Sequence, residues 1–564
     1  MAKLLSLTDF SGGLNTRLHP SRIADNESPV MRNVFYRDRG VLTKRLGRSA
    51  GIAADSSTNY DFLRGFTYRR PESTTIDNRT FVTGTAADTR NILYESTNSS
   101  VTAFDAVVVT LANTLNRAGS ATNVSTTSGK QTTLSVFNDK LLINHVINGA
   151  ATFQDLADYN CFQWAPAGGA VRIASSPVLA RSLVVHKDYV FTANDANDTA
   201  IDNNDRLMRN SHSTLRWSGR RDETLWPTNH NIIIGPRDGF PIMAIVSFGD
   251  TLTIFKSPRF YAETTTTGDF SGSSMWQLFG NDFDPASLTY ELRRVFTPSN
   301  VGLAFKDTLA TWQNTLMMLT NDGVYAFDGS NFAKITSRIQ STVDGWSMLR
   351  TGETVINADA SECGGIVWKD NYLLSVLERG SDLASTTQWG MGAVYVFTPE
   401  GTIWRWVLRD SANNNGIGHF VIDPSGRLLG LGHRTAAGDG QVYVYPMEQT
   451  TYADGTGAID AMWTSKEFDL KETHKFDHVY VHFSKQLSGT LRLEVSVDGG
   501  TFEGFNVPMS YTYGSIIKSN RIIIGKRGRT IQFRVSNAEP YVNFEVHEIE
   551  LHGNPVAVEH AHGG

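Results

Sequence analysis

The chain has few charged residues, few cysteines and no long apolar run. Charged residues make up 19% of its 564 residues, which suits short strands better than long helices laced with ion pairs. No stretch of eighteen apolar residues is present, so no transmembrane helix is expected. The apolar part of the start, MAKLLSLTDFSGG, is too short for a secretion signal, and we expect synthesis in the cytoplasm.

Recognisable catalytic and metal-binding motifs are also missing. The two cysteines, Cys161 and Cys363, have no CxxC neighbour, which disfavours a metal site or a disulfide framework. The sequence contains no GxSxG, HExxH, P-loop or GxGxxG motif. We therefore expect that the chain is not an enzyme and has no catalytic residue, metal or cofactor. Glycoside hydrolysis needs two nearby carboxylates, and nothing in the sequence singles out a pair.

A repeated phrase runs through the middle of the chain: an aromatic or apolar residue, then a turn with Asp or Asn, then an apolar run. The good copies are FNDKLLIN from Phe137, HKDYVFTA from His186, FGDTLTIF from Phe248, WQNTLMML from Trp312 and WKDNYLLS from Trp368. Looser copies start at Pro424 and Ile76. A turn that feeds a buried strand, repeated without amphipathic helices, indicates the blades of a β-propeller. A pair of stacked β-sandwiches is the rival interpretation.

The C-terminal part has the clean alternation of antiparallel strands. Apolar residues recur at every second position at Val479, Val481 and Phe483, and again at Ile531, Phe533 and Val535. The pattern shifts phase between Val546 and Ile549, which predicts a β-bulge. The sequence thus predicts an all-β fold: an N-terminal docking arm (1–50), an irregular β-propeller with long insertions and about six blades (51–452), an antiparallel β-sandwich (455–553) and a flexible tail (554–564).

The N-terminal arm differs in charge from the rest of the chain. Residues 1–50 hold nine basic and four acidic residues, a net charge of +5, whereas the whole chain carries −6 and the remainder −11. Such an asymmetry suggests that the arm meets something acidic, either nucleic acid or another protein. The arm is rich in glycine and proline, with one helix expected around 26–36, so we expect it to become ordered mainly against neighbouring protein.

The arm also carries a set of short motifs. They are the Phe-x-Gly-Gly-Leu-Asn phrase (Phe10 to Asn15), the Asp-Asn-Glu phrase (Asp25 to Glu27), Asn33-Val34, and the closing residues Gly40, Leu42, Arg45 and Gly47. In these the arm resembles the opening of tail nozzle (tail tubular protein B-like) proteins of short-tailed bacteriophages. The closing stretch FRVSNAEPYVNFEVHEIELHG is also similar to the end of such proteins. Related tail-end and stopper proteins share pieces of the pattern.

The resemblance implies a structural virion protein located in the tail. Such proteins form a homo-hexameric ring below the portal and adaptor rings, extend the DNA channel, retain the genome and let double-stranded DNA pass on infection. Their outer surface receives tail fibres or spikes. The residues implied in docking to partners are Phe10, Gly12, Gly13, Leu14, Asn15, Arg17, Arg22, Asp25, Asn26, Glu27, Arg32, Asn33, Arg45 and Gly47. The alternative is a glycan-active or glycan-binding β-propeller protein, or a related tail-end or stopper protein.

Overall fold

In the computed structural model, the chain is built from β-strands. The structure describes residues 2–37, 40–49, 51–52, 61–69, 78–85, 91–96, 101–106, 132–145, 160–165, 169–172, 180–195, 213–236, 238, 240–257, 272–287, 289–299, 301–339, 363–378, 391–408, 416–433, 444–447, 451–455, 457–510 and 515–556. No α-helix occurs among them, and the helical elements include the short 3-10 turns η5 (Lys306–Thr308) and η6 (Thr336–Arg338). No described helix is long and apolar enough to cross a membrane.

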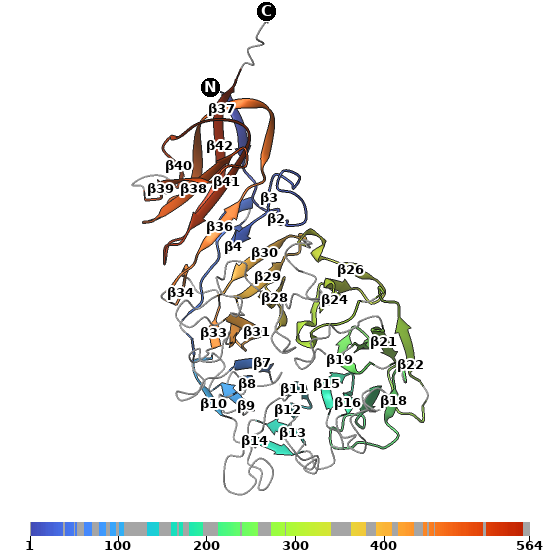
Figure 1. The fold of residues 1–564 in the computed structure, drawn as a ribbon. Coiled ribbons are helices and arrows are strands. Elements are labelled where there is room, and N and C mark those ends of the chain that lie inside the picture. Colours follow the sequence, from blue (N-terminus) through green and yellow to red (C-terminus); the bar gives the residue numbers. More distant parts are fainter. Residues whose placement is uncertain are drawn as a thin grey trace, which may run out of the picture.

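Seven antiparallel sheets follow one another along the chain and form the blades of a β-propeller (Figure 1). The first blade consists of β7 (Asp61–Tyr68), β8 (Arg79–Thr85), β9 (Asn91–Ser96) and β10 (Phe104–Ala106), and the second of β11 (Thr132–Phe137), β12 (Lys140–His145), β13 (Asn160–Ala165) and β14 (Gly169–Arg172). The third consists of β15 (Ala180–His186), β16 (Tyr189–Asp195), β17 (Thr214–Trp217) and β18 (Asn231–Ile233), the fourth of β19 (Ile242–Phe248), β20 (Thr251–Lys256), β21 (Ser274–Phe279) and β22 (Glu291–Val295), and the fifth of β23 (Ala310–Trp312), β24 (Thr315–Thr320), β25 (Gly323–Phe327) and β26 (Phe332–Lys334). The sixth consists of β27 (Gly364–Trp368), β28 (Asn371–Glu378), β29 (Met391–Phe397) and β30 (Ile403–Val407), and the seventh of β31 (Gly416–Ile422), β32 (Leu428–His433) and β33 (Val444–Pro446). The propeller prediction is confirmed, but the described strands form seven blades where about six were expected.

The repeated phrase forms the hairpin between the first and second strand of a blade. In three of these hairpins both turn residues are left-handed, at Asn138 and Asp139 (φ 50 and 59), Gln313 and Asn314 (φ 47 and 60), and Lys369 and Asp370 (φ 47 and 59). Two left-handed residues in succession match the right-handed twist of the flanking strands. Asn and Asp tolerate this conformation better than other side chains, which explains their place in the phrase.

The aromatic residue that opens the phrase connects one blade to the next. In the two copies that open with tryptophan, the indole N–H donates a hydrogen bond to a backbone carbonyl in the following hairpin. These bonds run from Trp312 Nε1 to the Asp370 carbonyl (2.8 Å) and from Trp368 Nε1 to the Gly426 carbonyl (3.1 Å). Tyr68, at the end of β7, makes a similar bond from its hydroxyl to the Asp139 carbonyl (2.6 Å). The phrase therefore encodes both the hairpin and part of the contact between blades.

The ring is closed by residues from both ends of the propeller. β31 of the last blade lies beside β7 of the first. Ile52, which precedes the first blade, exchanges two backbone hydrogen bonds with Val444 in β33 (2.8 and 3.0 Å). The segment before the first blade thus completes the three-stranded last sheet.

The C-terminal part is a single curved, nearly closed sheet at one end of the molecule, and four strands of the arm belong to it (Figure 1). Its strands are β1 (Ala2–Leu7), β4 (Met31–Arg32), β5 (Val34–Arg37), β6 (Val41–Lys44), β36 (Ala461–Thr464), β37 (Phe468–Ser484), β38 (Thr490–Val497), β39 (Glu503–Pro508), β40 (Ile516–Lys518), β41 (Ile522–Asn537) and β42 (Glu545–Pro555). Smaller pairs are β2 (Gly13–Leu14) with β3 (Glu27–Ser28), and β34 (Ala453–Asp454) with β35 (Gly457–Ala458). We call the large sheet the C-terminal barrel.

The alternating residues named from the sequence all face the interior of this barrel. Val479, Val481 and Phe483 are fully buried, as are Ile531, Phe533 and Val535. The predicted bulge is confirmed, because the register of β42 against β37 shifts between Glu548 and Val546. Of the tail, residues 557–564 lie outside the described part of the chain.

The arm is part of the fold, and its predicted helix is wrong. The stretch 26–36 contains β3, β4 and β5, and Asn33 within it has a left-handed backbone (φ 55) that no α-helix accommodates. β1 pairs with β42, β4 with β36, and β6 with β42. Backbone partners distant in sequence therefore override the local capping signals. A deletion of residues 1–48 would remove these strands from the barrel.

The hydrogen bond between the sixth and seventh blades can be tested at Trp368. We expect Trp368→Phe to lower the free energy of unfolding by about 1 kcal/mol, because the hydrogen bond to the Gly426 carbonyl is lost and that carbonyl is left without its partner. Chemical denaturation monitored by circular dichroism measures the change. Trp276→Phe is the control, because Trp276 Nε1 donates within its own blade, to Ser274 Oγ (3.1 Å). Equal losses in the two variants would contradict a special role for the bond between blades.

Candidate functional site

The Phe-x-Gly-Gly-Leu stretch of the arm lies between the barrel and the sixth blade. Phe10 is fully buried and packs edge-on against Trp463 of β36, with ring centroids 5.0 Å apart. Gly13 has φ +77, and a Cβ there would lie 2.8 Å from the Ile403 carbonyl oxygen of β30. Any larger residue would push the arm away from the blade, which explains the glycine.

Asn33 holds the arm against the outer strand of the same blade. Its backbone N–H donates to the Arg405 carbonyl (3.0 Å), and its side-chain oxygen accepts from the Val407 N–H (2.7 Å). The same oxygen accepts from Arg45 Nε (2.9 Å). One amide side chain thus joins the arm to β30 and orients the arginine beside it.

Arg45 forms a buried two-pronged ion pair with Asp454 of β34. The distances are 3.0 Å from Nη1 to Oδ1 and 2.5 Å from Nη2 to Oδ2, and the two side chains are 2% and 7% exposed. The guanidinium also donates to the Leu46 and Val407 carbonyls. Removal of either partner of such a pair would leave the other as an uncompensated buried charge, which is strongly destabilising.

Lys44, next to this pair, is buried without a carboxylate in contact. Its ammonium donates to Asn537 Oδ1 (2.9 Å) and to the Glu539 and Val542 carbonyls (2.9 and 3.2 Å). Burial, and then the charge of Arg45, lower the pKa of Lys44 to about 8. These contacts fix the arm to the turn between β41 and β42.

We call the contacts of Phe10, Gly13, Asn33, Lys44 and Arg45 the arm joint. The expectation that the motif residues dock to partners is corrected here for those whose side chains or backbone are buried inside this chain. These are Phe10, Gly13, Leu14, Asn15, Glu27, Asn33, Arg45 and Gly47, whereas Gly12, Asn26 and Arg32 are half-buried and Arg17, Arg22 and Asp25 are exposed. A buried side chain has no surface left for another molecule.

Four of the arm's nine basic residues form ion pairs with carboxylates of the same chain. The ion pairs are Lys3 with Glu548, Arg32 with Asp460, Arg37 with Glu545 and Arg45 with Asp454. Part of the acidic counterpart expected for the arm's charge is therefore the protein's own body. Sequence alone missed this because every partner lies more than 400 positions away.

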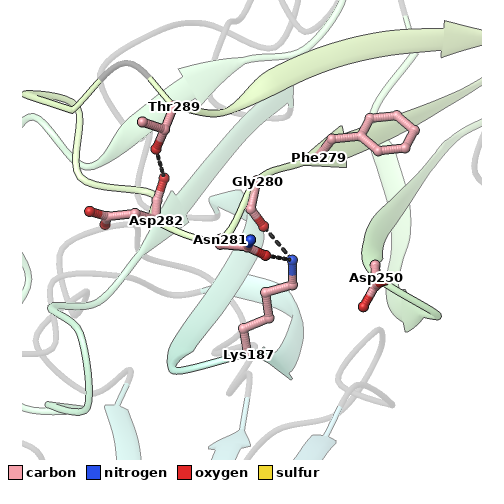
Figure 2. Close-up of a pocket in the computed structure, with 7 residues that line it drawn as sticks. All are labelled: Lys187, Asp250, Phe279, Gly280, Asn281, Asp282 and Thr289. Atoms are coloured by element: carbon pink, nitrogen blue, oxygen red, sulfur yellow. Dashed lines mark hydrogen bonds between the residues drawn. The ribbon is translucent and has the colours of Figure 1, made fainter.

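A separate pocket opens between the third and fourth blades (Figure 2). Its volume is about 540 Å³, and it is lined by Lys187, Asp250, Phe279, Gly280, Asn281, Asp282 and Thr289. The Lys187 ammonium points to the far wall, where it donates to the Gly280 carbonyl and to Asn281 Oδ1 (Figure 2). Asp250, at the hairpin between β19 and β20, is exposed at the rim.

The chemistry of the pocket is that of a hydroxyl-binding surface. Carboxylate, amide, hydroxyl and ammonium groups line the pocket together with Phe279. The Tyr189 hydroxyl donates to Asp282 (2.7 Å), and this bond lowers the pKa of that carboxyl. In the sequence Lys187 and Asp250 are only turn residues of the repeated phrase, and no motif marks the residues after β21.

Carboxylates are scarce on the first strands of the blades, which contact one another around the ring. Only β7 carries one, Asp61. A catalytic pair for glycoside hydrolysis would therefore need at least one carboxylate from outside the first strands. Among the described residues, no group of three or more His, Cys, Asp or Glu side chains is placed to hold a metal ion.

No protein-family model and no curated protein matches the chain. Solved structures that match include the exo-beta-1,3-galactanase from Phanerochaete chrysosporium with galactose (9% identity, TM-score 0.26, covering 89% of this chain and 100% of that one). Others are a glycoside hydrolase family 43 arabinoxylan arabinofuranohydrolase from Bacillus subtilis (11%, 0.24, 95% and 98%) and the Aleuria aurantia lectin (8%, 0.28, 63% and 96%). The expectation that the chain is not an enzyme is contradicted by these matches, because glycoside hydrolases are among them. At these identities and TM-scores the likeness assigns no activity to this chain.

The arm joint can be tested at Asp454. We expect Asp454→Asn to lower the free energy of unfolding by about 3–5 kcal/mol, because Arg45 is left as an uncompensated buried charge. The double variant Arg45→Met/Asp454→Leu should recover most of the loss, since neither charge remains buried. Denaturant titration monitored by tryptophan fluorescence measures both.

Asp25→Asn is the matched control for this test. It removes the same charge from an arm–barrel ion pair, with Lys466, but Asp25 is 73% exposed. The expected change is about 0–1 kcal/mol. A loss in Asp454→Asn no larger than in this control would show that the buried pair does not hold the joint.

Proposed function

We propose that the protein is a structural subunit of a bacteriophage tail, one copy of a nozzle ring below the portal and adaptor. The observation that carries the proposal is the set of arm motifs and their resemblance to tail nozzle proteins. The arm joint gives these motifs a physical role, because they fix a propeller and a barrel into one body. A subunit that stays in place while double-stranded DNA passes needs such a rigid link.

The proposal is tested on purified virions. Gold-labelled antibody against this chain should mark the tail below the portal, and reconstruction should show a ring of copies there. Isolated chains should not close a stable ring without the adaptor, because oligomers of this kind assemble through many weak contacts on a template. Label on the capsid or at the tips of fibres, or no label on virions, would contradict the nozzle role.

A second candidate function is glycan handling by the pocket between the third and fourth blades. The observation that favours it is the lining, in which polar groups and a phenyl face surround a volume typical of small-molecule sites, about 300–1,000 Å³. Hydroxyl groups of a sugar would bind to Asp250, Asn281 and Lys187. The two candidates are compatible, since the same propeller can face a host surface on a virion.

Glycan handling is tested with a glycan array and a turnover assay on the full chain. We expect Asp250→Asn to weaken binding about tenfold, which is the effect of losing one charge-assisted hydrogen bond. Asp370→Asn is the matched control, because it changes an exposed hairpin residue two blades away. No binding by the wild type, or equal loss in both variants, would remove this candidate.

A further inference from the structure

The arm carries a closed surface loop, residues 15–27, with a buried neck. Asn15 Nδ2 donates to Glu27 Oε2 (2.8 Å), and the same oxygen accepts from the Ala24 N–H (2.8 Å). The parallel pair β2–β3 brings Gly13 opposite Glu27. Ends that meet in this way define a compact loop of the kind that frequently carries function. We call it the arm loop, and it lies beside β2 and β3 in Figure 1.

The body of the molecule holds the arm loop in one conformation. The N–H groups of Thr16 and Arg17 both donate to the Arg338 carbonyl in η6 (3.0 and 3.1 Å). The Pro20 carbonyl accepts from Glu467 N–H (3.1 Å), and Ile23 is 2% exposed. A loop fixed at both sides loses little conformational entropy when a partner binds to it.

The tip of the arm loop presents basic and apolar side chains to solvent. Arg17, His19 and Arg22 are exposed, and Leu18 is 45% exposed. The described ion pairs join neither Arg17 nor Arg22 to a carboxylate, although Arg17 Nη1 lies 3.4 Å from the Ser337 carbonyl. Asp25 in the same loop is matched by Lys466. Among the described arm residues, the tip therefore carries two exposed arginines that no described ion pair joins to a carboxylate.

We propose that the arm loop docks onto an acidic surface of a second copy of this chain. Two copies repel each other overall, because each carries −6, so their contact requires local complementarity of charge. The residues outside 1–50 carry −11 and supply the acidic side of such a contact. A loop of one copy against a different surface of the next is a head-to-tail contact, the type that closes into rings. The choice of the same chain as partner rests on the proposed ring.

Charge reversal in the full chain tests the docking. We compare the wild type, R17E/R22E and the control R293E/R527E by sedimentation velocity at increasing protein concentration. The control makes the same change in charge at exposed residues of β22 and β41. We expect wild type and control to self-associate alike, more weakly with added salt, and R17E/R22E to associate about tenfold more weakly. Equal association of all three proteins, or none in the wild type, would overturn the proposal.

A photo-reactive residue at position 18 identifies the partner. We expect crosslinks between chains, mapped to peptides with exposed carboxylates and lost in R17E/R22E. Crosslinks only within one chain, or to added double-stranded DNA in preference to a second chain, would overturn the proposal. Because these experiments use the purified chain, an absence of label on virions would remove the ring role and leave the docking intact. If virions are labelled at the tail but the purified wild-type chain does not self-associate, only the docking proposal is removed.

Discussion

The buried ion pair between Arg45 and Asp454 is the contact on which the joining of the two halves depends. Asp454 lies in β34, where the chain leaves the propeller for the barrel, and Arg45 follows β6 of the arm. The guanidinium bonds to Asn33, which in turn bonds to β30 of the sixth blade. Burying two charges is costly unless every donor and acceptor is used. The joint is therefore stable only when arm, blade and barrel are all in place.

Apolar packing extends the same link. One hydrophobic cluster contains Phe10 and Val34 of the arm, Trp404 and Trp406 of the sixth blade, and Trp463 of the barrel. The third and fourth blades, in contrast, share a cluster of their own, and a further cluster joins the fourth blade to the fifth. Unfolding of the barrel would expose Trp404 and Trp406 of β30, whereas the pocket between blades three and four would keep its walls. The stability of the joint and the chemistry of the pocket are thus physically separate.

The blades were predictable from the sequence because a hairpin is a local structure. The five good copies of the phrase coincide with five hairpins, and in three of these Asp or Asn occupies a left-handed position. The role of the arm was not predictable. Arg45 and Asp454 are 409 residues apart, and nothing local distinguishes an arginine that binds inside its own chain from one that binds a partner. The false helix at 26–36 has the same cause, since only distant strands stabilise that segment as β-structure.

The distribution of charge follows from these contacts. In the sequence, a net charge of +5 on the arm and −11 on the remainder indicates that the arm binds an external acidic partner. In the fold part of that asymmetry is used inside the chain, by ion pairs that fix β1, β5 and the end of β6 to their neighbours. Arg17 and Arg22 differ from Lys3, Arg37 and Arg45 because they are exposed and no described ion pair joins them to a carboxylate. The same segment therefore has two physical roles: its buried residues build the subunit, and its exposed tip carries the charge that remains for association.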